Sequence, residues 1–378
     1  MAIQIAVPRD TRAGEKRVAM TPRIAERVVK LGATLLVESG AGVDSGISDA
    51  DYARVATVVK DPAPLYGQAD ILLQVQMPGV AQIRLLREGA VLACFAYAQQ
   101  HPEEVKLLCD RKVTTFAMEL VPRISRAQSL DALSSQAMVA GYKAALIAAN
   151  RLGRFFPMLT TAAGTIRPAK VLVIGAGVAG LQAMATARRL GAQVEGYDVR
   201  TSSREEVESL GAKFVSANIR AEGEGGYARE LTKEERQAQQ DVLLQHVRQA
   251  DVVICAANVP GRPAPKILLG AMVEAMKSGS LVVDLAADTG GNCDFTQPGQ
   301  EVRHGNVTIL GLVQVASMLA EDASQMYATN LYNLVSLFLK DGKISLDWSD
   351  EVIAKTVLTF GGEIKHNATR ELLQGAVK

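Results

Sequence analysis

Residues 170–180 have the sequence KVLVIGAGVAG, in which an apolar run leads directly into three closely spaced glycines. The apolar run is typical of a buried strand, and the pattern of residues 181–190 predicts a helix behind it. A GxGxxG motif between a strand and a helix indicates the phosphate-binding turn of a dinucleotide-binding domain. In such a turn Gly175 permits the sharp bend, Gly177 lets the backbone approach a pyrophosphate, and Gly180 lets helix and strand pack closely.

A carboxylate, Asp198, stands at the end of the next predicted strand, 18 residues after Gly180. There it can accept hydrogen bonds from both hydroxyls of an adenosine ribose, and its charge would repel a 2′-phosphate. Arg200 argues the other way, because an arginine at this place can hold that phosphate. The strand-end position of Asp198 favours NAD over NADP. The alternative is a tight strand-to-helix turn in an unrelated α/β protein.

Strands alternate with helices on both sides of this motif, which predicts an α/β fold of two Rossmann-like parallel-sheet domains, the second binding NAD. A long apolar helix from about residue 129 to 155 joins the two, and a helical pattern over 318–339 returns to the first. The first domain is therefore expected to be discontinuous, with residues 1–136 plus 318–378, and residues 137–317 form the second. Strands are expected at residues 3–7, 33–38, 71–76, 90–95, 112–118, 170–175, 194–198, 252–255, 281–285 and 307–310.

Composition excludes several classes of protein. The 378 residues carry a net charge of +1, with 48% hydrophobic and 21% charged residues, so a soluble globular protein is expected and nucleic-acid binding is not. No apolar run reaches the roughly 18 residues of a membrane helix, and the N-terminus lacks a secretory pattern. Neither the four cysteines nor the four histidines are spaced for a metal site. A cytoplasmic protein without a metal is predicted.

A second cluster of polar residues lies at the expected start of the long helix. Arg123, Gln128, Asp131 and Ser134 fall within fourteen residues there. One interpretation is structural, because Ser125 and Gln128 have the spacing of a capping box. The other is functional, because such a group can hold an anion or a nicotinamide carboxamide. The residues alone leave both open.

The sequence resembles the NAD(H)-binding components of proton-translocating nicotinamide nucleotide transhydrogenases over essentially its whole length. Its most specific part is RISRAQSLDALSSQ at 123–136, which related amino-acid dehydrogenases lack. The other segments are PRDTRAGEKRVAMTP at 8–22, AAGT at 162–165, GAGVAG at 175–180, NVPGRPAPK at 258–266 and VDLAADTGGNC at 283–293.

The resemblance implies a role for each member of the polar cluster. Arg123 and Gln128 would orient the carboxamide and ribose at the nicotinamide. Asp131 would hold Arg123 or the carboxamide amide, with Ser134 just behind.

Cofactor contacts are implied for a further set of residues: Gly175, Gly177, Val178, Gly180, Asp198, Val199, Arg200, Gly226, Tyr227, Gln239 and Asn258. Gly226 and Tyr227 belong to an implied mobile loop, for whose charged flank a solvated helix is the alternative. Two segments depart from the family pattern. Asn258 replaces an apolar residue, which is expected to alter the adenine or ribose contacts. Residues 311–317 stand where the family pattern has a proline and a nearby arginine, and this segment contains neither.

The implied activity is hydride transfer from NADH bound here to NADP⁺ bound on an NADP(H)-binding partner component. A membrane-spanning proton-channel subunit would couple that transfer to proton translocation, so the enzyme is complete only with its partners. Hydride transfer between two nicotinamides requires orientation and exclusion of water rather than an acid, a base or a metal. The resemblance further implies a homodimer, placed on the inner membrane only through its partner subunits.

Two alternative functions share part of this pattern. An alanine-dehydrogenase-like enzyme has the same RVAxTP start with Arg17 and also Asp288, but it requires a lysine and a histidine for an oxo acid. The matching positions have Gln76 and the stretch 95–98 without histidine, which argues against it. A non-catalytic NAD-binding module would not require the 123–136 segment.

Overall fold

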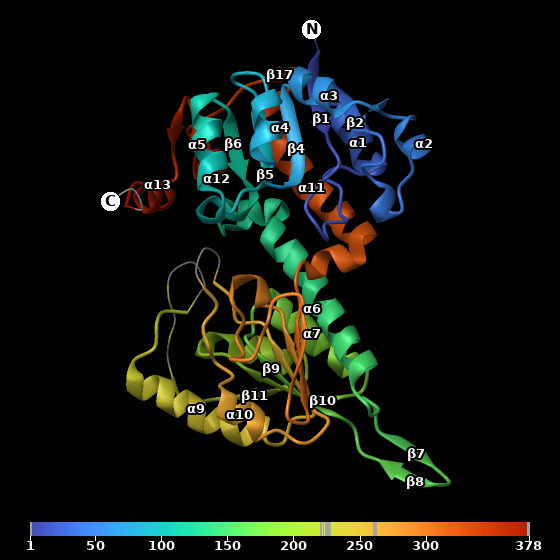
Figure 1. The fold of residues 1–378 in the computed structure, drawn as a ribbon, viewed down its shortest axis with the longest axis vertical. Helices are drawn as coiled ribbons and strands as arrows, with labels where there is room; N and C mark the ends of the chain where they lie inside the picture. The colour runs from blue at the N-terminus through green and yellow to red at the C-terminus, as the bar shows by residue number, and fades with distance from the viewer. Residues whose placement is uncertain (1, 220, 222, 224–227, 260–262, 376–378) are drawn as a thin grey trace. The chain divides into compact units, whose positions relative to one another are not determined.

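The computed structural model describes residues 2–219, 221, 223, 228–259 and 263–375. The chain divides into two compact units, Met1–Gln136 with Ser317–Lys378, and Ala137–Ala316. Each contains one large β-sheet with helices on both faces (Figure 1). The α/β fold with a discontinuous first domain agrees with the sequence prediction.

The first unit has an eight-stranded sheet in the order β19-β18-β6-β5-β4-β1-β2-β3. Pairing is parallel from β6 to β3, whereas β18 is antiparallel to both of its neighbours. The strands are β1 Ile3–Val7, β2 Ala33–Glu38, β3 Thr57–Val59, β4 Ile71–Gln76, β5 Val91–Phe95, β6 Thr114–Ala117, β18 Val357–Phe360 and β19 Glu363–Ile364.

Both faces of this sheet are covered, because successive side chains of a strand point to opposite sides. In β1, Ile5 and Val7 join the core beneath α1 and α11, whereas Ala6 joins the core beneath α3, α4 and α5. The helices of the unit are α1 Pro22–Val29, α2 Asp49–Tyr52, α3 Pro62–Gln68, α4 Val80–Leu85, α5 Pro102–Asp110, α11 Ala320–Phe338, α12 Glu351–Thr356 and α13 Asn367–Gly375. A short antiparallel pair, β16 Leu339–Lys340 and β17 Lys343–Ile344, follows α11.

The second unit has a seven-stranded sheet in the order β11-β10-β9-β12-β13-β15-β14, antiparallel only at β14. The central strands β9, β12 and β13 are nearly all apolar, which is typical of parallel strands that are buried on both faces. They are β9 Lys170–Ile174, β10 Gln193–Tyr197, β11 Lys213–Val215, β12 Val252–Cys255, β13 Leu281–Asp284, β14 Glu301–His304 and β15 Val307–Gly311. The strand order reverses between β9 and β12, which is where doubly wound sheets bind dinucleotides.

Five helices and a hairpin complete the described part of this unit. The helices are α6 Ala132–Arg151, α7 Val178–Arg189, α8 Arg204–Ser209, α9 Lys233–Val247 and α10 Gly270–Glu274, of which α6 starts in the first unit. The segment AAGT lies in the turn of an antiparallel pair, β7 Leu159–Thr161 and β8 Gly164–Ile166, which extends away from the sheet (Figure 1).

Some predicted boundaries were wrong. The long helix covers Ala132–Arg151 rather than 129–155, because residues 125–130 form a separate 3₁₀ helix before it. The helix predicted for 181–190 begins earlier, at Val178, so the glycine motif supplies its first turn. The returning helix starts at Ala320 rather than 318, after a 3₁₀ turn over Val315–Leu319.

Candidate functional site

The glycine-rich turn connects β9 to α7 at the point where the strand order reverses. Gly175 has φ +99°, and a Cβ there would lie 2.8 Å from the carbonyl carbon of Ala256. A Cβ on Gly180 would lie 1.8 Å from the carbonyl oxygen of Gly175, so only glycine lets α7 start this close to the strand. A Cβ on Gly177 would meet open space. The space above Gly177 is what an approaching pyrophosphate requires.

The N-terminus of α7 faces this turn. Its N-cap is Gly177, which has no side chain with which to cap the first backbone N–H groups. The half-buried Val178 is the first helical residue. Uncapped N–H groups and the helix dipole together favour an anion at such a helix end.

Asp198 follows the last residue of β10, and both oxygens of its carboxylate accept hydrogen bonds. Its Oδ2 accepts from the backbone N–H of Ala176 at 2.7 Å and from Arg200 Nη2 at 2.8 Å. Its Oδ1 accepts from the backbone N–H of Arg200 at 2.9 Å and from Arg200 Nε at 2.8 Å. Arg200 therefore forms an ion pair with the carboxylate of Asp198. Val199, which lies between them in the sequence, is half-buried.

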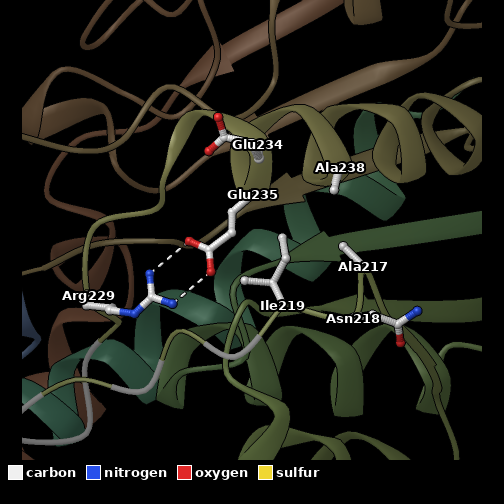
Figure 2. A pocket seen from close by; sticks show the side chains of 7 residues that line it. All are labelled: Ala217, Asn218, Ile219, Arg229, Glu234, Glu235 and Ala238. Carbon is white, nitrogen blue, oxygen red and sulfur yellow. Dashed lines mark hydrogen bonds and ion pairs between the residues drawn. The ribbon is translucent and has the colours of Figure 1, made fainter.

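A pocket of about 510 Å³ lies beyond the end of β11 (Figure 2). It is lined by Ala217, Asn218, Ile219, Arg229, Glu234, Glu235 and Ala238. Hydrogen bonds from Arg229 lower the pKa of Glu235 to about 2. The backbone N–H of Ala221 donates to the carbonyl of Val199 at 3.3 Å, which joins this segment to the loop carrying Asp198.

The other residues of this unit that were expected to contact the cofactor differ in their exposure. Gln239 is buried on α9, and Asn258 is exposed after β12, where its Oδ1 accepts from Thr289 Oγ1 at 3.2 Å. Gly226 and Tyr227 lie outside the described residues.

The polar cluster of the first unit lies around the 3₁₀ helix Ser125–Leu130 and the start of α6. The capping box of Ser125 and Gln128 is not formed, since Ile124 is the N-cap and no side chain caps this helix. Instead Asp131 accepts from the backbone N–H of Ser134 at 2.8 Å and from its hydroxyl at 2.5 Å. Asp131 and Ser134 are thereby brought together at the start of α6.

Helix α11 holds this segment in place. Asn330 and Asn333 each donate from Nδ2 to the carbonyl oxygen of Ser129 at 2.9 Å. Arg123 and Gln128 are both exposed. The structure thus presents Arg123 and Gln128 at the surface of a braced segment.

A buried ion pair, which sequence reasoning missed, lies at the end of β1 in the first unit. Arg17 binds Glu15 through Nε at 2.7 Å and Nη2 at 2.6 Å, and donates to Gln136 Oε1 at 2.8 Å. Gln76 Nε2 and Ser317 Oγ also donate to Glu15, at 2.8 and 2.5 Å. Burial raises the pKa of Glu15, but Arg17 and the hydrogen bonds outweigh it and lower that pKa to about 2.

This pairing bears on the oxo-acid alternative. Arg17, which belongs to the shared RVAxTP start, is buried and paired with Glu15 and Gln136. Arg12 contacts His101 Nε2 at 3.0 Å, so a histidine does lie near Gln76, although outside the stretch 95–98. Burial and the charge of Arg12 lower the pKa of His101. Gln76 still stands where such an enzyme would need its lysine.

Metal ligands and membrane spans were both expected to be missing from this chain. In the part of the chain that the structure describes, no three or more His, Cys, Asp or Glu side chains are arranged to hold a metal ion. No helix among the described residues is both long and apolar enough to cross a membrane.

Known proteins resemble this chain along its whole length. The family description "Alanine dehydrogenase/PNT, N-terminal domain" matches residues 6–140, and "Alanine dehydrogenase/PNT, C-terminal domain" matches residues 144–367. An NAD(P) transhydrogenase alpha-subunit chain of Rhodospirillum rubrum is 44% identical over 378 residues, covering 97% of this chain and 98% of the relative. Alanine dehydrogenase of Mycobacterium tuberculosis is 32% identical over 300 residues, covering 78% and 76%.

Solved structures give the same picture. A transhydrogenase from Sinorhizobium meliloti superposes with a TM-score of 0.87 at 40% identity, covering 96% of this chain and 99% of that one. An L-alanine dehydrogenase superposes with a TM-score of 0.81 at 23% identity, covering 99% of both chains, which shows a shared fold.

Proposed function

The chain belongs to the alanine dehydrogenase/PNT family, and we propose that it is the NAD(H)-binding subunit of a proton-translocating NAD(P)⁺ transhydrogenase. The observation that carries this proposal is the glycine-rich turn, in which Gly177 leaves open space beside an uncapped helix N-terminus while Asp198 stands at the neighbouring strand end. The similarity to transhydrogenase subunits favours this member of the family over an amino-acid dehydrogenase.

The residues of the second unit fit an NAD(H) molecule. The backbone N–H groups at the start of α7 would bind its pyrophosphate, with Gly175 and Gly180 fixing the turn and Val178 beside it. Asp198 would bind the adenosine ribose, flanked by Val199 and Arg200. Gly226, Tyr227, Gln239 and Asn258 complete the proposed contacts.

A role at the nicotinamide is proposed for the polar cluster of the first unit. Arg123 and Gln128 would orient the carboxamide and ribose of the nicotinamide. Asp131, which binds Ser134, would hold Arg123 or the carboxamide amide. NADH held by this chain would supply the hydride for NADP⁺ on an NADP(H)-binding partner component. Rate enhancement would then come from positioning and from exclusion of water.

Proton movement would be the task of a membrane-spanning proton-channel subunit. The present chain would lie in the cytoplasm as a homodimer, attached to the inner membrane only through its partners. It would complete no reaction alone.

A transhydrogenation assay tests this function. The purified chain is mixed with a separately prepared NADP(H)-binding component, NADP(H), NADH and an oxidised NAD analogue, and reduction of the analogue is followed by absorbance. We expect turnover that requires both proteins and falls at least tenfold in Arg123→Ala, with Arg9→Ala, an exposed arginine of the same unit, as control. Absence of exchange, together with NADH oxidation by pyruvate and ammonia, would establish an amino-acid dehydrogenase instead.

A further inference from the structure

Asn292 is completely buried in the segment after β13, and both ends of its side-chain amide form hydrogen bonds. Its Oδ1 accepts from the backbone N–H of Ala257 at 3.0 Å, and its Nδ2 donates to the carbonyl of Ala257 at 2.7 Å. Nδ2 also donates to the carbonyl of Pro265 at 2.9 Å. One side chain thus binds both backbone groups of Ala257, as a neighbouring strand would.

The segment that carries Asn292 is itself rigidly held. Asp284 is buried at the end of β13 and accepts from the backbone N–H of Cys293 at 3.0 Å and from Thr296 Oγ1 at 2.6 Å. Lys266 Nζ donates to the carbonyls of Gly290 at 2.7 Å and Cys293 at 2.9 Å. The Asn292 carbonyl accepts from the N–H groups of residues 267 and 268. These hydrogen bonds fix the position of the segment that carries Asn292.

The loop that Asn292 holds lies against the glycine-rich turn. The backbone of Ala256 and Ala257 is so close to Gly175 that a Cβ there would meet both at 2.8 Å. Ala256 also donates its N–H to the carbonyl of Ile174 at 2.8 Å. This loop leaves the end of β12, which neighbours β9 at the reversal of strand order. Its position consequently sets one wall of the crevice in which a dinucleotide would lie.

We propose that Asn292 is a positioning residue for NAD(H), fixing the loop after β12 so that the crevice is preformed. This inference rests on the proposed function. Because the half of the sheet containing β9, β10 and β11 carries Asp198 and would hold the adenosine end, the loop after β12 acts on the nicotinamide half. Without the Asn292 side chain, the backbone of Ala257 loses the two hydrogen bonds that hold it beside the turn. Small displacements of positioning groups are costly to binding and catalysis.

Affinities of the full-length chain for NADH and for AMP test this role. In Asn292→Ala the Kd for NADH, measured by its fluorescence, is expected to rise at least tenfold. The Kd for AMP, measured by calorimetry, is expected to stay within twofold, because AMP occupies only the adenosine half. Asn306→Ala is the matched control, since Asn306 is an exposed asparagine of the same unit.

A general folding defect would weaken NADH and AMP equally, and that result would overturn the proposal, as would an unchanged Kd for NADH. If Asn292→Ala does not fold, Lys266→Met loosens the same segment from an exposed position. It is expected to raise the Kd for NADH about threefold with AMP unchanged, and no such selectivity would contradict the role. A wild-type chain that fails to bind NADH would overturn the proposed function together with this inference.

Discussion

The Asp198 carboxylate binds both the backbone of the glycine-rich turn and the side chain of Arg200, so its charge contributes to the local structure. In Asp198→Asn the shape is kept but the charge is lost, so Arg200 loses its ion pair with this carboxylate. We expect the Kd for NADH to rise about tenfold, which corresponds to about 1.4 kcal/mol. Affinity for NADPH should increase, because an arginine at this place can then bind the 2′-phosphate.

Fluorescence titration of NADH and NADPH measures both affinities. Asp241→Asn, at an exposed aspartate of α9, is the control and should change neither. A variant that keeps the wild-type preference for NADH would show that Asp198 does not select between the two dinucleotides.

The buried pair of Glu15 and Arg17 predicts a pH dependence of stability. The pKa of Glu15 in the folded chain is lowered to about 2 from its ordinary value of 4.5, because Arg17 and the hydrogen bonds outweigh the effect of burial. Stability from this pair is therefore fully present above about pH 4.5 and is lost as the pH falls towards 2.

In Arg17→Met the Glu15 carboxylate stays buried without its counter-charge, and the free energy of unfolding at pH 7 should fall by about 3 kcal/mol or more. Protonation of Glu15 relieves this penalty, so the deficit should shrink between pH 7 and pH 4. Urea unfolding across this range provides the measurement. Arg9→Met removes an exposed pair with Asp44 and should cost below about 1 kcal/mol, and an equal loss in both variants would refute the buried role.

At the scale of single residues, the sequence identified groups whose role is local. Gly175, Gly180 and Asp198 lie within one strand–turn–helix–strand unit, so their spacing alone placed them together. Asn292 and Glu15 were missed, because Asn292 binds Ala257 across 35 positions and Glu15 also needs partners from distant segments. Glu15 meets Ser317 across 302 positions of the chain.

At the scale of elements, two glycines of one turn should behave differently. Gly177→Ala adds a methyl group in open space at φ −82°, so folding should be unaffected while the approach of a pyrophosphate is blocked. Gly180→Ala drives a Cβ into the carbonyl of Gly175, so α7 must shift.

We expect Gly177→Ala to unfold thermally within about 2 °C of wild type and to bind NADH at least tenfold more weakly. Gly180→Ala should lose both NADH affinity and several degrees of thermal stability, since strained or overpacked sites typically cost about 1–3 kcal/mol. Differential scanning calorimetry and NADH titration separate the two. Normal NADH binding by Gly177→Ala would show that the pyrophosphate does not pass over this turn.

Helix boundaries show where local patterns are insufficient. The sequence offered Ser125 as a cap, but the segment forms a 3₁₀ helix fastened by Asn330 and Asn333, and Asp131 caps α6 instead. Thr21 occupies the N-cap position of α1 but makes no capping bond, and it donates its hydroxyl to Gln325 Oε1 at 2.8 Å. In both cases a tertiary partner on α11 outcompeted the nearby backbone.

At the scale of the whole molecule, the fold class was accessible because its signals repeat along the chain. Long apolar strands such as Lys170–Ile174 alternate with helices, and each such unit adds evidence for a parallel sheet. Short strands at or next to the sheet edges were missed: β3, β11, β14, β18 and β19 have two to four residues each. Their hydrophobic pattern is too brief to be distinguished from a loop.

By itself the sequence determined the α/β class, the dinucleotide turn and the candidate for the ribose, because each depends on residues close together in the chain. Tertiary structure alone decided that Glu15 also binds Gln76 and Ser317, and that Asn292 holds the loop beside Gly175. A side chain's partner depends on the orientation of both groups in the folded chain, and buried polar groups take whichever donor or acceptor packing brings to them. The spacing of residues in a sequence therefore does not predict which partner a buried polar group will bind.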